Sequence, residues 1–574
     1  MKKIMLGNEA FAQGAYEAGV GFISSYPGTP STEISEYAAG FDEIDVQWAP
    51  NEKVALESAV GASVAGMRSM SCMKHVGLNV AADPLFTSSY IGVNAGLVVI
   101  VADDPGCYSS QNEQDSRYYA MAAGIPMLEP SDSTEARDFV IRAFELSEKY
   151  DTPVIIRSNT RLGHSRGLVE AGTRKEVPLF EYKKEMAKRV MMPAMAVNAH
   201  KVLEKRINTI KEDSSSFDIN RIEYADRKIG IITSGVAYQY VKEAVPDASV
   251  LKLGMVYPLP EKLIREFASS VEKLYIVEEL EPIIENAVKA MGIGAVGKEI
   301  LTIQGEYSTN LLKKAFGTGK VEFTGSGDIP QRPPIMCPGC PHRGVYYVLS
   351  KNRYTVTGDI GCYTLGALAP LSSVDTCLCM GASISMAGGM EKARGKEFAR
   401  KLVAVIGDST FLHSGMTGLL NLVYNGSTAT VMILDNSTTG MTGHQDNPAT
   451  GKDAKGNPAP AVDLETLVRA IGVKRVRTVD PFDLEGMEKA VKEETAKEEL
   501  SVIISRHPCA LIDRTRKNKY ASSEKCRNCG MCMKLGCPAI TRTEKGVVID
   551  QSMCQGCGLC SKVCPFGAIG EVER

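Results

Sequence analysis

Cysteines are the residues of this sequence whose spacing most directly indicates chemistry. Of 16 cysteines, eight lie in the last 49 residues, in two runs of the form Cys-x2-Cys-x2-Cys that each end in a fourth cysteine and a proline. Three such closely spaced thiolates hold one iron–sulfur cubane, and the distant fourth cysteine ligates the other cluster. We therefore predict two [4Fe–4S] clusters: cluster 1 on Cys526, Cys529, Cys532 and Cys564, and cluster 2 on Cys554, Cys557, Cys560 and Cys537.

These runs resemble those of bacterial two-cluster ferredoxins. Four residues precede Cys537 where the usual run has three, a difference that bears on the geometry or potential of cluster 2. A pair of zinc sites is the alternative, because Cys-x2-Cys pairs also bind zinc in fours. The two trailing prolines and the lack of interleaved histidine favour the iron–sulfur interpretation.

A second pattern places a carboxylate and an amide after two apolar runs. KLVAVIGDST carries Gly407, Asp408 and Ser409, and ATVMILDNSTTG carries Asn436, 28 residues after Asp408. In an open α/β sheet, the carboxyl ends of the strands form the ligand-binding edge. Carboxylate and amide oxygens at that edge suit Mg²⁺ bridging a diphosphate, whereas Gly-Asp-Ser alone is also a common turn.

This pattern resembles the diphosphate-binding motif of thiamine diphosphate (ThDP) enzymes. The resemblance implies that Asp408, the Asn436 side chain and the Thr438 carbonyl hold Mg²⁺, and that Gly407 and Ser409 belong to the same cofactor site. Ser409 stands where the family usually has glycine.

ThDP enzymes need a second domain, whose glutamate binds the aminopyrimidine ring and promotes formation of the reactive ylid. In LESAVGASVAGMR, Glu57 precedes Gly66 by nine residues, a spacing that matches this domain, and its small neighbours allow close approach of a ligand. We therefore predict Glu57 for this catalytic role. Glu52 is the rival, and a surface glutamate on an amphipathic helix is the alternative.

The segment SSYPGTPSTEI resembles the YPxTP signature of the 2-oxoacid:ferredoxin oxidoreductases. The resemblance implies that Thr29 contacts the substrate carboxylate and the cofactor. A helix N-cap at Thr29 followed by Pro30 at the first helical position is an ordinary structural interpretation of the same residues, compatible with that role.

Four further cysteines indicate a third cluster. In the pyruvate and 2-oxoglutarate members of that family, cysteines in matching contexts hold a [4Fe–4S] beside the thiazolium, where an electron relay needs its first station. The alternative is a zinc or redox Cys-x2-Cys with two buried thiols. The cluster 3 cysteines are Cys337, Cys340, Cys362 and Cys509; we expect Cys72, Cys107, Cys377 and Cys379 to be packing residues.

The elements that must position these residues alternate short apolar runs with Gly/Pro turns and amphipathic stretches, which predicts a multidomain α/β protein with parallel, doubly wound sheets. A length of 574 residues suggests about four domains. We predict a pyrimidine-binding ThDP domain (1–185), a connecting helix and linker (186–227), a Rossmann-like, transketolase C-terminal-like domain (228–305), a linker (306–334), a diphosphate-binding ThDP domain (335–515) and a two-cluster ferredoxin-like domain (520–574).

Composition narrows the function classes. A net charge of −3 gives no argument for nucleic-acid binding. The longest apolar stretch, AGLVVIVA at 95–102, is far too short to cross a bilayer. The sequence therefore predicts a soluble, cytoplasmic protein without a nucleic-acid or membrane partner.

The order of these motifs covers nearly the whole chain and resembles the alpha subunit of the indolepyruvate branch of the 2-oxoacid:ferredoxin oxidoreductase family. The resemblance implies oxidative decarboxylation of an aryl pyruvate, indolepyruvate first, with CoA as co-substrate, to an arylacetyl-CoA and CO₂. It also implies that electrons pass to an external ferredoxin and that a smaller beta subunit carries the CoA-binding gamma-type domain, in a hetero-oligomer.

Two questions about function stay open in the sequence. The pyruvate enzymes carry a carboxylate-binding arginine where this chain has Ala102, Asp103 and Asp104, so carboxylate recognition must differ. His75 and Arg117 are the substrate candidates, and a structural role is the alternative favoured for each of them. The alternative functions are an iron–sulfur electron-transfer subunit of another 2-oxoacid oxidoreductase, and a non-oxidative ThDP decarboxylase.

Overall fold

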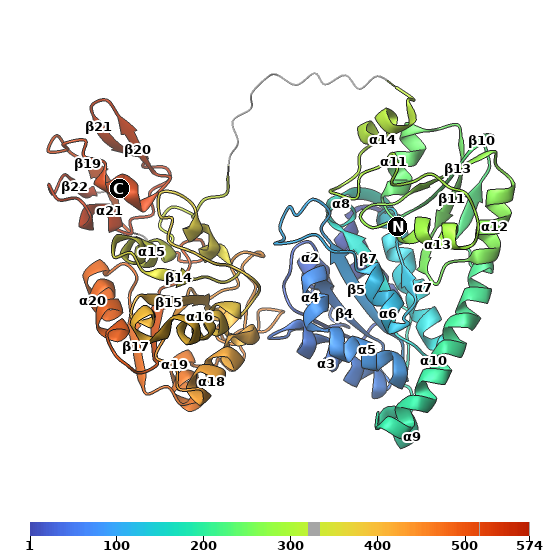
Figure 1. Cartoon of the computed structure of the whole chain (residues 1–574), viewed down its shortest axis with the longest axis horizontal. Helices are drawn as coiled ribbons and strands as arrows, with labels where there is room; N and C mark the ends of the chain where they lie inside the picture. Colours follow the sequence, from blue (N-terminus) through green and yellow to red (C-terminus); the bar gives the residue numbers. More distant parts are fainter. Residues whose placement is uncertain (320–332, 516, 573–574) are drawn as a thin grey trace. The chain divides into compact units, whose positions relative to one another are not determined.

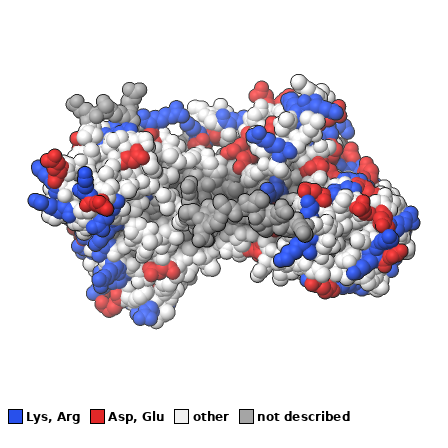
Figure 2. All heavy atoms as spheres, turned by 90° about the horizontal axis from the view of Figure 1, so that it is seen from above, with Lys and Arg blue, Asp and Glu red and all other residues white. Residues whose placement is uncertain are grey.

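The computed structural model describes residues 1–319, 333–515 and 517–572, which form two compact units, 1–326 and 327–574 (Figure 1). Residues 320–332 of the predicted 306–334 linker lie outside the described residues, as do residues 573–574 of the predicted C-terminal domain. No helix in the described ranges is long and apolar enough to cross a membrane. On the face seen in Figure 2, acidic and basic side chains are interspersed.

The first unit is built on a seven-stranded sheet in the order β12-β6-β7-β5-β4-β2-β3. Its inner strands are completely buried runs, because helices cover them and parallel sheets are buried on both faces. Six strands are parallel and β12 is antiparallel to β6. The strands are β2 (Phe22–Ser25), β3 (Asp45–Trp48), β4 (Ser69–Lys74), β5 (Leu97–Asp103), β6 (Met127–Leu128), β7 (Val154–Asn159) and β12 (Met255–Tyr257).

Helices of this unit begin where side chains satisfy free backbone N–H groups. Asn51 accepts from Val54 N at the start of α3, and Asp132 accepts from Glu135 N at the start of α7. Helix α3 packs on β2 and β4, α7 on β5 and β7, and α1 against α2 and α7. The helices are α1 (Gly7–Glu17), α2 (Thr32–Ala38), α3 (Glu52–Val64), α4 (His75–Val80), α5 (Ala82–Ile91), α6 (Arg117–Ala123), α7 (Ser133–Tyr150) and α8 (Thr160–His164).

A second, four-stranded sheet of the same unit has the order β13-β10-β11-β9. The segment SVLKLGMVYPLP divides between the two sheets, since β11 stays in this one and β12 joins the first. The elements are β9 (Arg221–Glu223), β10 (Asp226–Ser234), β11 (Ala248–Leu253), β13 (Lys273–Val277), α11 (Ala237–Ala244), α12 (Glu261–Ser269), α13 (Ile283–Ala290) and α14 (Thr309–Phe316). Outside the two sheets lie α9 (Met186–Arg189), α10 (Pro193–Asp213) and the pair β1 (Lys2–Leu6) and β8 (Arg166–Glu170).

The second unit contains a five-stranded parallel sheet in the order β14-β15-β16-β18-β17. Its strands are β14 (Thr355–Thr357), β15 (Leu402–Gly407), β16 (Thr430–Asp435), β17 (Arg475–Val479) and β18 (Ser501–Arg506). Its helices are α15 (His342–Lys351), α16 (Ala382–Ala399), α17 (Asp408–Thr410), α18 (Met416–Tyr424), α19 (Leu464–Ile471) and α20 (Leu484–Thr495).

The Cys-rich end of the second unit folds as two small antiparallel pairs and one short helix. Strand β19 (Lys519–Ser522) pairs with β22 (Ile569–Val572), and β20 (Ile540–Thr543) pairs with β21 (Gly546–Ile549). Helix α21 (Leu559–Lys562) completes it. Leu535, Ile549 and Leu559 join the same hydrophobic core as residues of α15 and β15, so this end packs directly on the five-stranded sheet domain.

Candidate functional site

The carboxyl edge of the second unit's sheet gathers the predicted diphosphate and cysteine residues. Strands β14, β15, β16 and β18 lie side by side, and each ends just before one of them: Cys362, Asp408, Asn436 and Cys509. The Cys509 N–H donates to the Asn436 carbonyl at 2.9 Å. This is the edge at which an open parallel sheet binds ligands.

Three oxygen-bearing groups converge there in the way Mg²⁺ requires. One terminal atom of the Asn436 amide lies 3.0 Å from the Thr438 carbonyl oxygen and 3.2 Å from Asp408 Oδ1. If this atom is the amide nitrogen, it donates to both oxygens. If it is the amide oxygen, it forms a triad of oxygen ligands with them. Which of the two atoms lies there is assigned from the surroundings of the amide. Octahedral Mg²⁺ with 2.0–2.1 Å bonds places adjacent ligands about 3 Å apart. Asp408, Asn436 and Thr438 therefore fit this metal.

Electrostatics at Asp408 agree with a cation site. Asp408 is buried, and its Oδ2 has no hydrogen-bond partner among the described residues. Burial, and next the negative charge of Asp435, raise the pKa of Asp408 to about 7. A divalent cation would oppose both effects on the Asp408 pKa, because opposite charge favours the ionised carboxylate. The adjacent Ser409 accepts from the Thr439 hydroxyl at 3.0 Å, and Gly407 packs against the Tyr363 ring.

The cluster 3 cysteines converge beside this triad. The thiolate charge of Cys337 acts on the other three, where it adds to burial in raising the pKa of Cys340 to about 12, of Cys362 to about 11, and of Cys509. A Cβ placed on Gly440 would lie 3.5 Å from Asn436 Nδ2 and 3.6 Å from Cys362 Sγ. Cys362 and Cys509 thus lie next to the loop that carries the candidate Mg²⁺ ligands, and the charge of Cys337 acts on both.

The eight C-terminal cysteines separate into the two predicted sets. The four cluster 1 cysteines line one small pocket, and the four cluster 2 cysteines line another. Charges within the first set act on Cys532, and charges within the second set act on Cys557 and Cys560. Each set is therefore gathered around its own space, with the fourth cysteine contributed by the other run.

In the described ranges, no three His, Cys, Asp or Glu side chains are grouped to hold a single metal ion. The candidate Mg²⁺ site has only one such side chain, Asp408. The assignment of iron–sulfur clusters to the three cysteine sets stays a prediction.

In the first unit, Thr29 follows a strand of the sheet, and the two candidate glutamates differ in burial. Helix α2 begins at Thr32, so Thr29 is not an N-cap but part of the loop after β2. Glu57 is exposed and pairs with Lys53 on the same helix. Glu52 is buried, and its carboxylate lies against Gly77 in the first turn of α4, where a Cβ would collide with it. The geometry favours Glu52 over the predicted Glu57 for an interior ligand.

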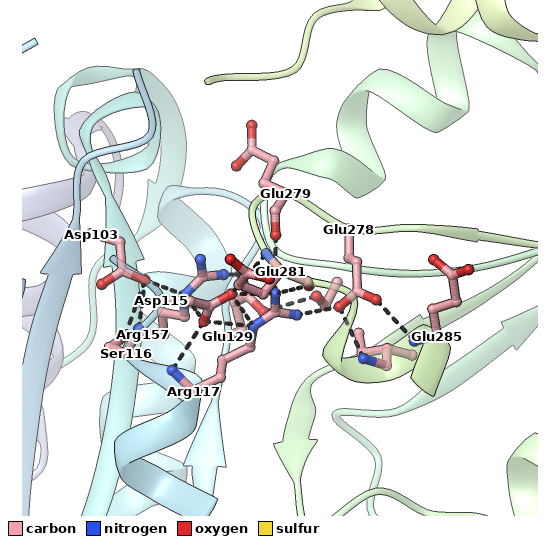
Figure 3. A network of polar contacts seen from close by, with 12 residues as sticks. Asp103, Asp115, Ser116, Arg117, Glu129, Arg157, Glu278, Glu279, Glu281 and Glu285 are labelled. Atoms are coloured by element: carbon pink, nitrogen blue, oxygen red, sulfur yellow. Dashed lines mark hydrogen bonds and ion pairs between the residues drawn. The ribbon is translucent and has the colours of Figure 1, made fainter. Parts of the chain in front are cut away.

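The predicted substrate candidate Arg117 belongs to a buried charge network instead (Figure 3). Its guanidinium donates to Asp115, to Glu278 at 2.5 Å and to the Glu279 and Glu281 carbonyls, so this arginine ties the first sheet to the second. Its side chain is 1% exposed. These internal partners favour the structural role for Arg117, and its contact with substrate stays an untested prediction.

His75 keeps an unusual position. Its ring is 1% exposed, and neither ring nitrogen has a hydrogen-bond partner within the described residues. Burial lowers its pKa, against the charge of Asp103. His75 lies at the β4–α4 junction, and its contact with substrate stays a prediction.

The sequence analysis missed one residue of this edge and misassigned three cysteines. Lys74, which precedes His75, is buried at the same edge as Thr29, and its position at the end of an apolar strand was the available signal. Of the cysteines expected to pack, Cys72 is buried, but Cys107, Cys377 and Cys379 are exposed. That expectation was wrong for these three because they lie in loops rather than in strands.

Comparison with known families agrees with this arrangement. Residues 13–232 match the model "Pyruvate flavodoxin/ferredoxin oxidoreductase, thiamine diP-bdg". Residues 359–505 match "Thiamine pyrophosphate enzyme, C-terminal TPP binding domain", and residues 547–570 match "4Fe-4S binding domain". Fold and site together define a ThDP-dependent 2-oxoacid:ferredoxin oxidoreductase with iron–sulfur electron transfer.

Individual relatives narrow the class. The chain is 40% identical to the indolepyruvate oxidoreductase subunit IorA of Archaeoglobus fulgidus, over 93% of this chain and 91% of that protein. The IorA of Pyrococcus horikoshii is also 40% identical, over 100% and 97% of the two chains. The 2-oxoglutarate synthase subunit KorA of Methanothermobacter marburgensis is 28% identical, over 47% and 86%. The chain belongs to the indolepyruvate oxidoreductase subunit IorA family.

Proposed function

We propose that this chain, together with a smaller beta subunit, decarboxylates an aryl pyruvate, indolepyruvate first, and transfers the acyl group to CoA. The products are the arylacetyl-CoA, CO₂ and two one-electron-reduced ferredoxins. The observation that carries the proposal is the convergence of the Asp408–Asn436–Thr438 triad with the cluster 3 cysteines at one sheet edge. The choice of indolepyruvate rests on the names of the IorA relatives.

The second unit would anchor the cofactor and receive its electrons. Asp408, Asn436 and the Thr438 carbonyl would hold Mg²⁺ on the diphosphate. When bound, ThDP supplies the carbanion that adds to the 2-oxo carbon and takes up the electron pair left by CO₂. The cysteines beside Asn436 provide the first acceptor position for those electrons.

In the first unit we assign the aminopyrimidine contact to Glu52 and the substrate loop to Thr29. Glu52 is the first residue of α3, where the helix dipole favours a carboxylate. Its buried position excludes competing water from the hydrogen bond it would make. Glu57 stays the alternative that a variant can test.

An electron route leads outward from the cluster 3 cysteines. Gly339, between Cys337 and Cys340, lies so close to Gln555 that a Cβ at Gly339 would be 2.7 Å from that side chain. Gly339 also lines the space enclosed by the cluster 2 cysteines. We infer the order cluster 3, cluster 2, cluster 1, external ferredoxin.

Product analysis of the complex with its beta subunit tests the proposed reaction. With indolepyruvate, CoA and ferredoxin under anaerobic conditions, we expect indoleacetyl-CoA and two reduced ferredoxins per CO₂. Ferredoxin reduction without CO₂ release would instead indicate an electron-transfer subunit. An aldehyde product without ferredoxin reduction would indicate a non-oxidative decarboxylase.

A further inference from the structure

A buried lysine lies at the carboxyl edge of the first unit's sheet without an acidic partner. Lys74 is the last residue of β4 and is 7% exposed. Its Nζ donates to the Ser109 carbonyl at 2.6 Å and to the Ser109 hydroxyl at 3.3 Å. Among the described residues, no carboxylate oxygen lies within 4.0 Å of it. Burying an ammonium without a counter-charge is unfavourable, so this position needs a reason.

The nearest carboxylate, Asp104, is engaged elsewhere. Asp104 accepts from Ser109 N at 2.8 Å, from the Ser110 hydroxyl at 2.5 Å and from the Thr160 hydroxyl at 2.8 Å. These bonds hold the loop that follows β5 in place over Lys74. The lysine charge is therefore only partly compensated by the chain itself.

Lys298 shows what a half-buried lysine with satisfied N–H groups looks like in the same unit. Its Nζ donates to the Glu278 carbonyl at 2.7 Å, to the Thr302 carbonyl at 3.3 Å and to the Tyr307 hydroxyl at 2.8 Å. Its three N–H groups thus have acceptors on three different residues. Lys74 has acceptors on exposed Ser109 alone, within the described part of the chain.

Lys74 lies against the loop that carries Thr29, the predicted substrate residue. A Cβ placed on Gly28 of YPGTP would lie 3.1 Å from Lys74 Cβ. The Ser109 hydroxyl, which Lys74 contacts, donates to the Thr29 carbonyl at 3.2 Å. Gly77, three residues after Lys74, contacts Glu52. Lys74 therefore lies between the candidate substrate and aminopyrimidine residues.

We propose that Lys74 binds the carboxylate of the 2-oxo acid, in place of the arginine that the pyruvate enzymes use. The inference rests on the proposed function. A carboxylate would displace Ser109 from Nζ and give the buried ammonium a charge-assisted hydrogen bond. One ammonium without a second cation suits a single carboxylate better than a phosphate, for which the second unit already supplies the candidate metal site.

The pH dependence of substrate binding provides a signature. Burial lowers the pKa of Lys74 to about 8, against the charges of Asp104 and Cys107. Above that pH the free enzyme loses the positive charge, so the KM for the 2-oxo acid should rise. Of the other groups facing Nζ, His75 has a lowered pKa, Cys107 a raised one and Asp104 a lowered one, so none of these shifts moves a titration toward pH 8.

The experiment uses the holoenzyme with its beta subunit and compares Lys74→Met, Lys74→Arg and the matched control Lys298→Met. Steady-state KM values for indolepyruvate and CoA, and the Kd for ThDP, are measured from pH 6.5 to 9.5. Lys74→Met should raise the KM for indolepyruvate about tenfold or more, the cost of one charge-assisted hydrogen bond. Lys74→Met should leave the KM for CoA and the Kd for ThDP within about twofold of the wild type. Lys298→Met should leave all three constants within about twofold of the wild type. Lys74→Arg should abolish the rise in KM above pH 8, because guanidinium stays charged.

Calorimetry with unreactive ligands separates this inference from the proposed function. Indolelactate carries the carboxylate and tryptophol lacks it, and neither is a 2-oxo acid. Weaker indolelactate binding in Lys74→Met alone, with equal tryptophol binding, would support the inference even if turnover of indolepyruvate failed. An unchanged KM and unchanged indolelactate affinity, or a loss confined to ThDP or CoA binding, would overturn it.

Discussion

Substituting the two glutamates of α3 separately gives the sharpest prediction about the first unit. Glu52→Gln keeps the size of the side chain and its packing on Gly77 but removes the charge. Loss of a positioned acid–base group typically costs 10²–10⁴-fold in rate, about 3–5 kcal/mol of transition-state stabilisation. Glu57 is 45% exposed and forms an i,i+4 pair with Lys53, and a surface pair of this kind contributes little to stability. We therefore expect Glu57→Gln to change kcat by less than about twofold.

The assay is anaerobic ferredoxin reduction with saturating indolepyruvate, CoA and ThDP. Circular dichroism and the iron–sulfur absorbance of each variant control for folding and cluster content. Glu52→Gln should retain both signals while losing at least about 100-fold in kcat. A large loss in Glu57→Gln with near-normal activity in Glu52→Gln would refute the reasoning, and would return the role to the exposed glutamate.

Three further variants test the remaining assignments. Asp408→Ala should abolish Mg²⁺-dependent ThDP binding, measured by calorimetry, while all iron–sulfur absorbance remains; retained ThDP affinity would remove Asp408 from the metal site. Cys557→Ser should lower the iron content by about four atoms per chain and slow reduction of external ferredoxin, while CO₂ release from a single turnover persists; unchanged ferredoxin reduction would place the route elsewhere. Arg117→Met should destabilise the first unit by about 3–5 kcal/mol in denaturant unfolding, because it leaves Asp115 and Glu278 buried without their partner; a stable variant with a raised KM would restore Arg117 as a substrate residue.

The spacing of residues along the sequence was enough to predict those parts of the site that lie within one loop or on two adjacent strands. The two C-terminal runs specify which cysteine joins which set, because three residues of each run share one tight loop and the fourth cannot reach it. Asp408 and Asn436 could be paired because they end two apolar runs that lie next to each other in a parallel sheet. The first inference needs only the spacing within each run, and the second needs only the direction and order of the strands.

Residues whose roles depend on orientation or on distant partners could not be predicted. Glu52 and Glu57 share one helix, but five residues rotate about 140° around its axis, and composition alone does not say which side faces the sheet edge. Arg117 finds Glu278 across 161 residues, a contact that only the tertiary fold creates. Strand β12 follows β11 of the four-stranded sheet in sequence but pairs with β6 of the seven-stranded sheet, which is also a long-range contact.

Anaerobic visible absorbance tests the central claim, that ThDP chemistry feeds electrons into the iron–sulfur clusters of this chain. The complex with its beta subunit, ThDP and Mg²⁺ is mixed with indolepyruvate, with and without CoA, beside Asp408→Ala under the same conditions. The account predicts bleaching of the iron–sulfur bands in the wild type, completed by CoA and absent in Asp408→Ala, although dithionite bleaches both. Failure of indolepyruvate and other 2-oxo acids to bleach the wild type, while dithionite still does, would contradict it.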